Sequence, residues 1–311
     1  MQGPETPRRE ISHVALLDLT GAAANALEGV TRIVDVAAIL VPESLLPRLS
    51  SIPMHHVAAT VPIPDGRRVR VLTGQVVLAG EALAAPADGA AETLVVTGQL
   101  ILTSPAPDIG RDVVVLGQIV APTGSEAGLG RSLRRLTGQV VYYPVPEGAR
   151  VQVRNGGVMG GEALANPGGE PRDVLLVTGT AVLTGPVETI GYQQVVVLGN
   201  ALVPRGAEAT ITGRVQTQAG RVIAYDAPPR VFDGKHSLSA AYFEFLDAPI
   251  TLVVDGKCSM EDDVTPELIR QKVSGLVLDG KLVAPRRVIP ALQVVALVLD
   301  GKLVASGDAD E

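Results

Sequence analysis

Short apolar segments that stop at a glycine recur along most of the chain. From residue 70 onward an apolar run ends at a glycine and a second short apolar run follows, as at residues 94–98, 113–117 and 175–179. A corner that contains proline or charged residues then precedes the next run. Apolar runs of this length, bounded by glycine, predict short buried strands, because glycine tolerates bends and close backbone contacts.

The recurrence has a period of about 21 residues. The glycine pattern extends from Gly74 to Gly301 in eleven steps. The first sixty residues contain a different recurring pattern, in which an apolar residue is followed by two spacer residues and then by Val-Ala. Its valines lie at positions 14, 36 and 57. Repeats of this kind predict an all-β fold, a parallel β-solenoid of about fourteen coils of 20–22 residues with a few short helical corners.

A longer period lies over the short one. Residues 80–117 match residues 161–199 at an offset of 81 or 82, and roughly half of the aligned positions are identical. The offset is about four repeats, so the duplicated block contains a whole number of them.

A strand–helix horseshoe, like that of leucine-rich repeats, is the alternative fold. Residues 42–49 and 285–292 share the pattern Pro-x-x-apolar-apolar-Pro-x-Leu, which could form a short helical turn. Residues 262–272 predict a helix with acids at its start and bases at its end. Asp-Gly-Lys phrases, which could form hairpin turns, begin at positions 233, 255, 279 and 300.

The composition favours a β architecture with a core of small branched side chains. Aromatic residues make up 3% of the chain and Trp is absent. The single cysteine, Cys258, excludes an intramolecular disulfide framework and suits a reducing compartment, so we expect a cytoplasmic protein. No apolar run that is free of Gly, Pro and charge is long enough for a membrane-spanning helix, which argues against a membrane span.

The charge pattern argues against nucleic acid as a partner. The net charge is −7. Two basic clusters interrupt the acidic chain, and neither has aromatic residues interleaved for base stacking. They are Arg67, Arg68 and Arg70, and Arg131, Arg134 and Arg135. We interpret both clusters as solvated edges.

No catalytic or ligand-binding set can be assembled from the sequence. His13 and His56 precede equivalent valines, so we expect them to stack, but no Cys or acidic cluster lies at ligand spacing from them. The acidic run at residues 261–263 lies where a helix should start, which explains it as capping. We therefore expect no enzyme, no cofactor and no metal. A polysaccharide-acting β-helix enzyme is the remaining catalytic alternative.

The repeats extend almost to both ends of the sequence. We expect one repeat domain, residues 11–304, between a polar tail (1–10) and an acidic tail (305–311). Neither tail is long enough to form the polar cap that soluble repeat proteins carry, and an open strand edge can pair with another chain. This predicts a structural protein that polymerises head to tail with itself into filaments or a scaffold.

The expected contact residues lie on the two terminal coils. They are Val14, Ala15, Leu16, Leu17, Leu297, Val298, Leu299, Leu303 and Val304. A monomeric module that binds a protein or glycan on a lateral face is the alternative function.

Val-rich coils punctuated by glycine, such as residues 113–117 and 195–199, resemble those of bactofilins, cytoskeletal β-solenoids that polymerise through their ends. The resemblance is architectural and covers residues 11–304. It implies end-to-end assembly and carries over no functional residue. The Pro-x-x-apolar-apolar-Pro corners depart from the bactofilin pattern, and the chain is longer than a typical member.

The repeat also predicts the most buried side chains. They are Val96, Val115, Leu116, Val177, Val197, Leu198, Val254, Leu278 and Leu299.

Overall fold

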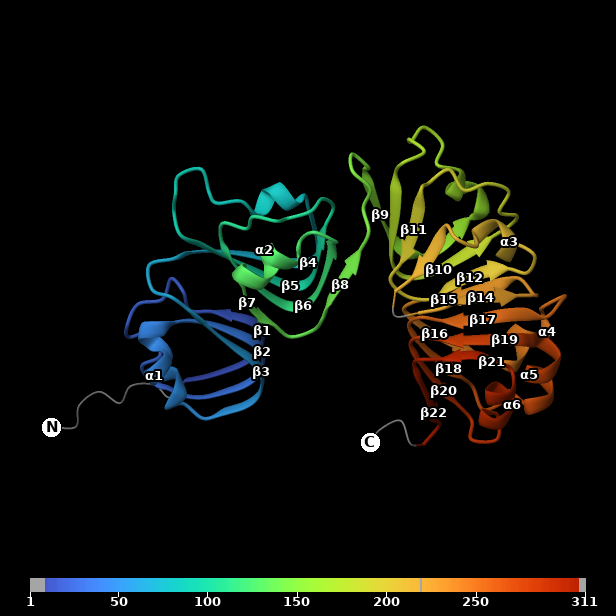
Figure 1. Cartoon of the computed structure of the whole chain (residues 1–311). Coiled ribbons are helices and arrows are strands. Elements are labelled where there is room, and N and C mark those ends of the chain that lie inside the picture. The colour runs from blue at the N-terminus through green and yellow to red at the C-terminus, as the bar shows by residue number, and fades with distance from the viewer. Residues whose placement is uncertain (1–8, 219, 308–311) are drawn as a thin grey trace. The chain divides into compact units, whose positions relative to one another are not determined.

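The structure is a computed structural model that describes residues 9–218 and 220–307 (Figure 1). Strands dominate it, and neighbouring strands in every sheet run parallel. The chain divides into two compact lobes, residues 1–144 and 145–311. Of the expected tails, residues 1–8 and 308–311 lie outside the described residues, and the boundaries of the repeat domain at 11 and 304 stay a prediction.

The first lobe is built from two groups of strands. The first stack is a sheet in the order β1 (Arg9–Asp18), β2 (Val30–Pro42) and β3 (Met54–Ile63). The second stack contains β4 (Arg68–Leu78), β5 (Glu92–Leu102), β6 (Asp112–Pro122) and β7 (Leu133–Leu136) in order, with β8 (Val140–Tyr143) paired to β6. The helical corners are η1 (Glu43–Leu45), α1 (Leu46–Ser50), η2 (Gly80–Leu83) and α2 (Glu126–Ser132).

The second lobe contains the third and fourth stacks. The third stack consists of β9 (Val151–Gly160), β10 (Val174–Thr184), β11 (Gln194–Val197), β12 (Ala201–Pro204), β13 (Val215–Thr217) and β14 (Val222–Tyr225). One sheet of the fourth stack consists of β15 (Pro229–Phe232), β17 (Ile250–Val254), β19 (Val273–Leu278) and β21 (Ala296–Leu299). Its other sheet consists of β16 (Lys235–Leu238), β18 (Lys257–Met260), β20 (Lys281–Ala284) and β22 (Lys302–Ala305). The helical corners are η3 (Gly161–Ala165), α3 (Glu208–Ile211), α4 (Ala240–Glu244), α5 (Pro266–Lys272) and α6 (Ile289–Val294).

The expected single solenoid of about fourteen coils is wrong, because the strands form separate parallel sheets. Within the described residues, pairing stops between β3 and β4, between β8 and β9, and between β14 and β15. Each junction contains or borders on two prolines, at positions 62 and 64, 144 and 146, and 228 and 229. Proline has no N–H to donate and restricts the preceding residue, which favours a break in the ladder. Nor do the strands line one continuous sheet, as the horseshoe alternative requires.

Each stack is also buried on its outer face by another stack of the same lobe. In the first lobe, Val95 and Val114 of the second stack pack in one cluster with Leu40 of the first. In the second lobe, Val253 of the fourth stack packs in one cluster with Val182 of the third. Burial on both faces explains why the strands are apolar at consecutive rather than alternating positions.

The period of the sequence appears in the structure as the register between neighbouring strands. Arg68 on β4 pairs with Glu92 on β5, so each residue of β4 lies beside the residue one repeat further along the chain. Thr93 on β5 pairs in the same way with Asp112 on β6. The strand repeats are therefore confirmed, although they do not join into one stack.

The glycine of one repeat lies directly against the glycine of the preceding repeat. Gly117 pairs with Gly98, and a Cβ atom at Gly117 would lie 1.8 Å from the Gly98 carbonyl oxygen. At Gly280 a Cβ atom would lie 2.0 Å from the Gly256 carbonyl oxygen. Only a residue without a side chain fits these positions, which is the physical cause of the glycine pattern.

The expected core is confirmed at most of its positions. The confirmed residues, each at most 1% exposed, are Val96, Val115, Val177, Val197, Val254 and Leu278. Leu116 and Leu198 are half-buried beside their glycine corners. The expected burial of Leu299 is wrong, because this side chain is 43% exposed. It pairs with Leu278 on one side, and no described strand covers its other side.

The expected helical corners form. The segments at 42–49 and 285–292 contain η1 with α1, and α6. The helix expected from residue 262 begins later, at Pro266, and its cap is Thr265, whose hydroxyl accepts a hydrogen bond from the Leu268 N–H at 3.2 Å. The Asp-Gly-Lys phrases join strands of two different sheets and are not hairpin turns, because all pairing around them is parallel.

A buried tyrosine shows that the internal duplication extends to side-chain contacts. Tyr143 on β8 pairs with Pro122, and its hydroxyl donates to the Leu102 carbonyl oxygen at 2.6 Å. Tyr225 on β14 repeats this contact with the Leu183 carbonyl oxygen, also at 2.6 Å. Burial raises the pKa of both phenols, so both stay protonated donors at neutral pH.

We expect Tyr143→Phe to lower the free energy of unfolding by about 1–3 kcal/mol, because it leaves the buried Leu102 carbonyl without its donor. Urea denaturation followed by circular dichroism measures the change. Tyr142→Phe is the matched control, because the neighbouring Tyr142 side chain is only half-buried. Equal effects of both substitutions would contradict the role of the Tyr143 hydroxyl.

Among the described residues, no helix combines the length and the apolar character that crossing a bilayer requires.

Candidate functional site

The expected contact residues near the start of the chain lie on β1, the outer strand of the first stack. β1 pairs with β2 along one edge, and no other described strand pairs with it. Val14, Leu16 and Leu17 are half-buried and Ala15 is exposed. The partner of Val14 on β2 is Val36, which is 0% exposed. β1 therefore leaves the core of its stack partly open.

The other expected contact residues lie on β21 and β22, the outer strands of the fourth stack. Leu297 and Leu299 are 41% and 43% exposed, and Leu303 and Val304 are half-buried. Val298 is buried and packs in one cluster with residues of the third stack. All five residues therefore lie on one outer edge, and four of their side chains are at least partly exposed there, while that of Val298 is covered by the third stack.

A residue of the neighbouring helix α6 adds to the apolar surface exposed by β21 and β22. Val294, at the end of α6, is 81% exposed and lies shortly before Leu297 in the chain. Val294, Leu297 and Leu299 are all large apolar side chains that the fold leaves in water. We call them, with Leu303, the C-terminal apolar edge.

Aromatic side chains lie at the ends of three stacks, and none lies on β1, β21 or β22. Tyr142 and Tyr143 lie on β8, Tyr225 lies on β14, and Phe232 lies on β15, each at an end of its stack. A bulky ring is tolerated at an end, where no further repeat must match its shape. The first stack and residues 289–305 contain no aromatic residue.

At both edges the backbone turns a corner near the middle of the edge. His13 in β1 has a left-handed φ of 57°, and the pairing with β2 skips this residue. Asp300 and Gly301 separate β21 from β22 in the same way. β1 has four residues before His13 and five after it, and β21 and β22 have four each.

The expected stacking of His13 and His56 is observed, with Asp35 between them. The Asp35 carboxylate lies 2.9 Å from His56 Nδ1 and 3.6 Å from His13 Nε2. All three residues have left-handed φ angles and occupy the corner that glycine occupies in the other stacks. In the part of the chain that the structure describes, no group of three or more His, Cys, Asp or Glu side chains is arranged to hold a metal ion.

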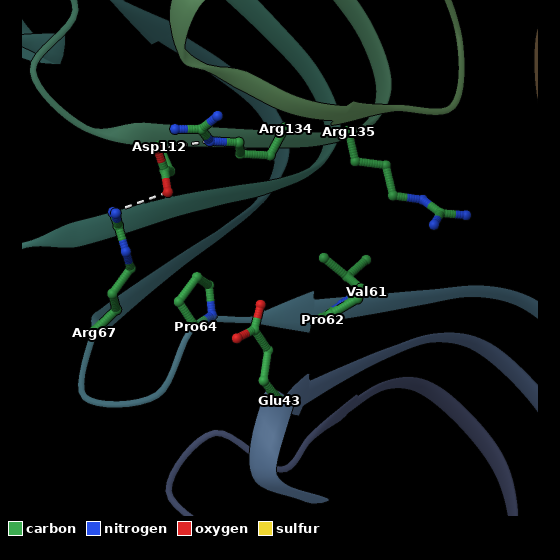
Figure 2. Close-up of a pocket in the computed structure, with 8 residues that line it drawn as sticks. All are labelled: Glu43, Val61, Pro62, Pro64, Arg67, Asp112, Arg134 and Arg135. Atoms are coloured by element: carbon green, nitrogen blue, oxygen red, sulfur yellow. Dashed lines mark hydrogen bonds and ion pairs between the residues drawn. The ribbon is translucent and has the colours of Figure 1, made fainter. Parts of the chain in front are cut away.

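A cavity of about 380 Å³ lies in the first lobe, between the end of β3 and the start of β7 (Figure 2). Its lining residues are Glu43, Val61, Pro62, Pro64, Arg67, Asp112, Arg134 and Arg135. The two basic clusters that we interpreted as solvated edges each contribute to it. This cavity is the functional candidate that the sequence does not reveal.

Asp112 organises the charges of the cavity. Its side chain is 10% exposed and accepts from Arg67 Nη1 and from Arg134 Nε, both at 2.9 Å. Figure 2 shows Arg67 approaching Asp112 from the turn before β4 and Arg134 approaching it from β7. Arg135 donates from Nη1 to the Thr60 carbonyl oxygen at 2.9 Å. A buried carboxylate with two arginines is satisfied, so it holds both side chains in place.

A bulge in β7 directs two consecutive arginines into this cavity. Leu133 pairs with Val113 and Arg135 pairs with Val114, so Arg134 is an extra residue in the ladder. Consecutive residues of a regular strand point to opposite faces, and a bulge removes that alternation. Neither the bulge nor its pairing can be read from the sequence, which is why the cavity was not expected.

A second, adjoining hollow of about 440 Å³ shares Arg67, Asp112 and Arg134 with this cavity. Arg111 pairs there with Glu92, and both side chains are at most 10% exposed. Buried acids therefore anchor the arginines of this region, while Arg134 remains 58% exposed.

Comparison with protein-family models, with curated proteins and with solved structures finds no match to this chain. The comparisons therefore give no support to the resemblance to bactofilins.

Proposed function

We propose that the protein is a structural component that associates with further copies of itself through two of its outer edges, β1 and the C-terminal apolar edge. In this proposal β1 of one copy pairs with β21 and β22 of the next copy. At both edges, apolar side chains of the outer strand are partly exposed, while the residues paired with them on the next strand are buried. This observation carries the proposal.

Strand geometry favours a head-to-tail contact. Every strand pair in the fold is parallel, and adding β1 beyond β21 and β22 can keep that direction. Two copies of the same edge, related by a twofold axis, would have to pair antiparallel. A contact between two different edges leaves one free edge at each end, so it can repeat and generate a filament.

The shapes of the two edges are compatible. Both consist of two short strand segments on either side of a corner, at His13 in β1 and at Asp300 and Gly301 between β21 and β22. Pairing would supply partners to backbone groups along both segments and cover Leu299 and Leu303 with the half-buried side chains of β1. Burial of this apolar surface is the main expected source of affinity.

Sedimentation velocity over a range of protein concentrations tests the proposal. We expect the weight-average sedimentation coefficient to rise with concentration at near-neutral pH, and elongated particles to appear in negative-stain electron microscopy. A single monomeric species at every concentration would contradict the proposal. The lateral-face binding module would then be the better account.

We also propose that this assembly takes place in the cytoplasm. Cys258 is the only cysteine, and its thiol is buried and unpaired. Burial raises its pKa to about 11, so the thiol is protonated and unreactive at neutral pH. A reducing compartment suits such a chain. Localisation of a tagged full-length chain by microscopy tests this part of the proposal.

A further inference from the structure

We propose that the cavity of Figure 2 binds a small organic anion, one that carries a carboxylate or phosphate group, through Arg134 and Arg135. This inference concerns a ligand site in the first lobe and does not depend on self-association.

The first argument is the state of the arginines. Arg134 contacts Asp112 through Nε, and its two Nη groups have no partner among the described residues. Arg135 forms its described hydrogen bond with a neutral carbonyl oxygen, that of Thr60. Both guanidinium groups therefore keep N–H donors for an anion, and Figure 2 shows them on different sides of the cavity, Arg134 beside Asp112 and Arg135 on the side of Val61.

The second argument is charge. The cavity is lined by three arginines and two acids, Glu43 and Asp112. Asp112 accepts from both Arg67 and Arg134, so its negative charge is already matched. A net positive charge remains in the lining of a protein whose net charge is −7. An anionic ligand neutralises this excess.

The third argument is the apolar wall. Val61, Pro62 and Pro64 line the side of the cavity that belongs to the end of β3 and the following turn. Figure 2 shows the Glu43 carboxylate pointing toward the cavity beside Pro64. The ligand therefore needs a carbon body for the wall and can place a hydroxyl or amine donor near Glu43. A cavity of about 380 Å³ has the size of known small-molecule sites.

The bulge in β7 is consistent with a functional origin of this arrangement. A regular strand would place Arg134 and Arg135 on opposite faces, and the extra residue breaks a ladder hydrogen-bond pattern to bring both into one cavity. Bulges of this kind are common beside ligand sites, where they redirect a side chain.

Calorimetric titration of the full-length protein with inorganic phosphate, phenyl phosphate and benzoate tests the proposal. We expect saturable binding of phenyl phosphate or benzoate, and weaker binding of inorganic phosphate, which cannot contact Val61 or Pro64. A preference for phenyl phosphate would assign the natural ligand to phosphate esters, and a preference for benzoate would assign it to carboxylic acids. Absence of saturable binding by all three probes at millimolar concentrations would overturn the proposal.

Variants connect the binding to the two arginines. Arg134→Gln with Arg135→Gln should weaken binding about tenfold or more, as expected for loss of charged hydrogen bonds. Arg135→Gln alone should weaken it too, and this variant leaves the pairs of Asp112 intact. Arg205→Gln is the matched control, because Arg205 engages Asp226 through Nε and is 61% exposed but lies outside the cavity.

Protection from chemical modification gives a second readout. The probe that binds should slow the reaction of Arg134 and Arg135 with phenylglyoxal, measured by mass spectrometry, and leave Arg205 unaffected. Equal affinity of the native protein and the double variant, or equal protection of all three arginines, would overturn the assignment. A variant that cannot self-associate should bind the probes as the native protein does, which separates this proposal from the previous one.

Discussion

Replacing Leu299 and Leu303 by lysine is expected to abolish self-association and leave the fold intact. Leu299 is 43% exposed and Leu303 is half-buried on the outermost strands of the fourth stack. In the monomer the new ammonium groups can reach water, because long lysine side chains extend past apolar surface. In the paired state both would be buried without a partner, so we expect association to weaken at least about a hundredfold.

Val77→Lys is the matched control for this experiment. Val77 lies on β4 and is 44% exposed, so the substitution adds the same charge at an exposed strand position outside the proposed contact. Circular dichroism and urea denaturation should show that both variants fold. If the Leu299→Lys and Leu303→Lys variant sediments as the native protein does at every concentration, the C-terminal apolar edge is not the contact.

Gly117→Ala is expected to destabilise the first lobe by about 3 kcal/mol or more, through a clash that the backbone must relieve. The new Cβ atom would lie 1.8 Å from the Gly98 carbonyl oxygen. That oxygen belongs to the backbone of the neighbouring strand, so no side chain can rotate to make room. The residue also has a φ of 150°, which alanine rarely adopts.

Gly130→Ala provides the comparison for Gly117→Ala. Gly130 lies in α2, and no atom outside the adjoining helix backbone lies within 4 Å of the position that its Cβ would occupy. Alanine favours the helix by up to about 1 kcal/mol over glycine, so this variant should be as stable as the native protein or more so. Urea denaturation midpoints measure both effects. Similar midpoints for the two variants would show that the glycine pattern does not reflect close strand contact.

The strands and their period could be predicted because they depend on local sequence. Gly98 and Gly117 recur because each faces the other across a strand pair with no room for a side chain. Val96 and Val115 are buried because a parallel register places equivalent residues side by side. The positions of glycine and valine within each repeat therefore reflect the contacts between neighbouring strands.

The division into separate sheets could not be predicted in the same way. Val95 and Val114 are as apolar as the residues of the stack interior, and nothing in a repeat says which partner sheet will cover them. Prolines interrupt the pairing at three junctions, but prolines also lie inside stacks, as Pro122 and Pro204 do. The composition of a junction therefore does not fix whether the ladder continues.

The arginine cavity depends on tertiary structure alone. Arg67 and Arg134 lie several repeats apart in the sequence, and both reach Asp112 because β4, β6 and β7 lie in one sheet. The bulge that turns Arg134 inward leaves no local signature in residues 133–136.

Mixing two complementary variants tests head-to-tail assembly most directly. One variant carries Leu299→Lys with Leu303→Lys, and the other carries Val14→Lys with Leu16→Lys on β1. Each should be monomeric alone, because each retains a single working edge. Analytical ultracentrifugation of an equimolar mixture should show a 1:1 dimer and no larger species, because one β1 edge and one C-terminal apolar edge remain to pair. A mixture that stays monomeric, or a variant that dimerises by itself, would contradict head-to-tail pairing of these two edges.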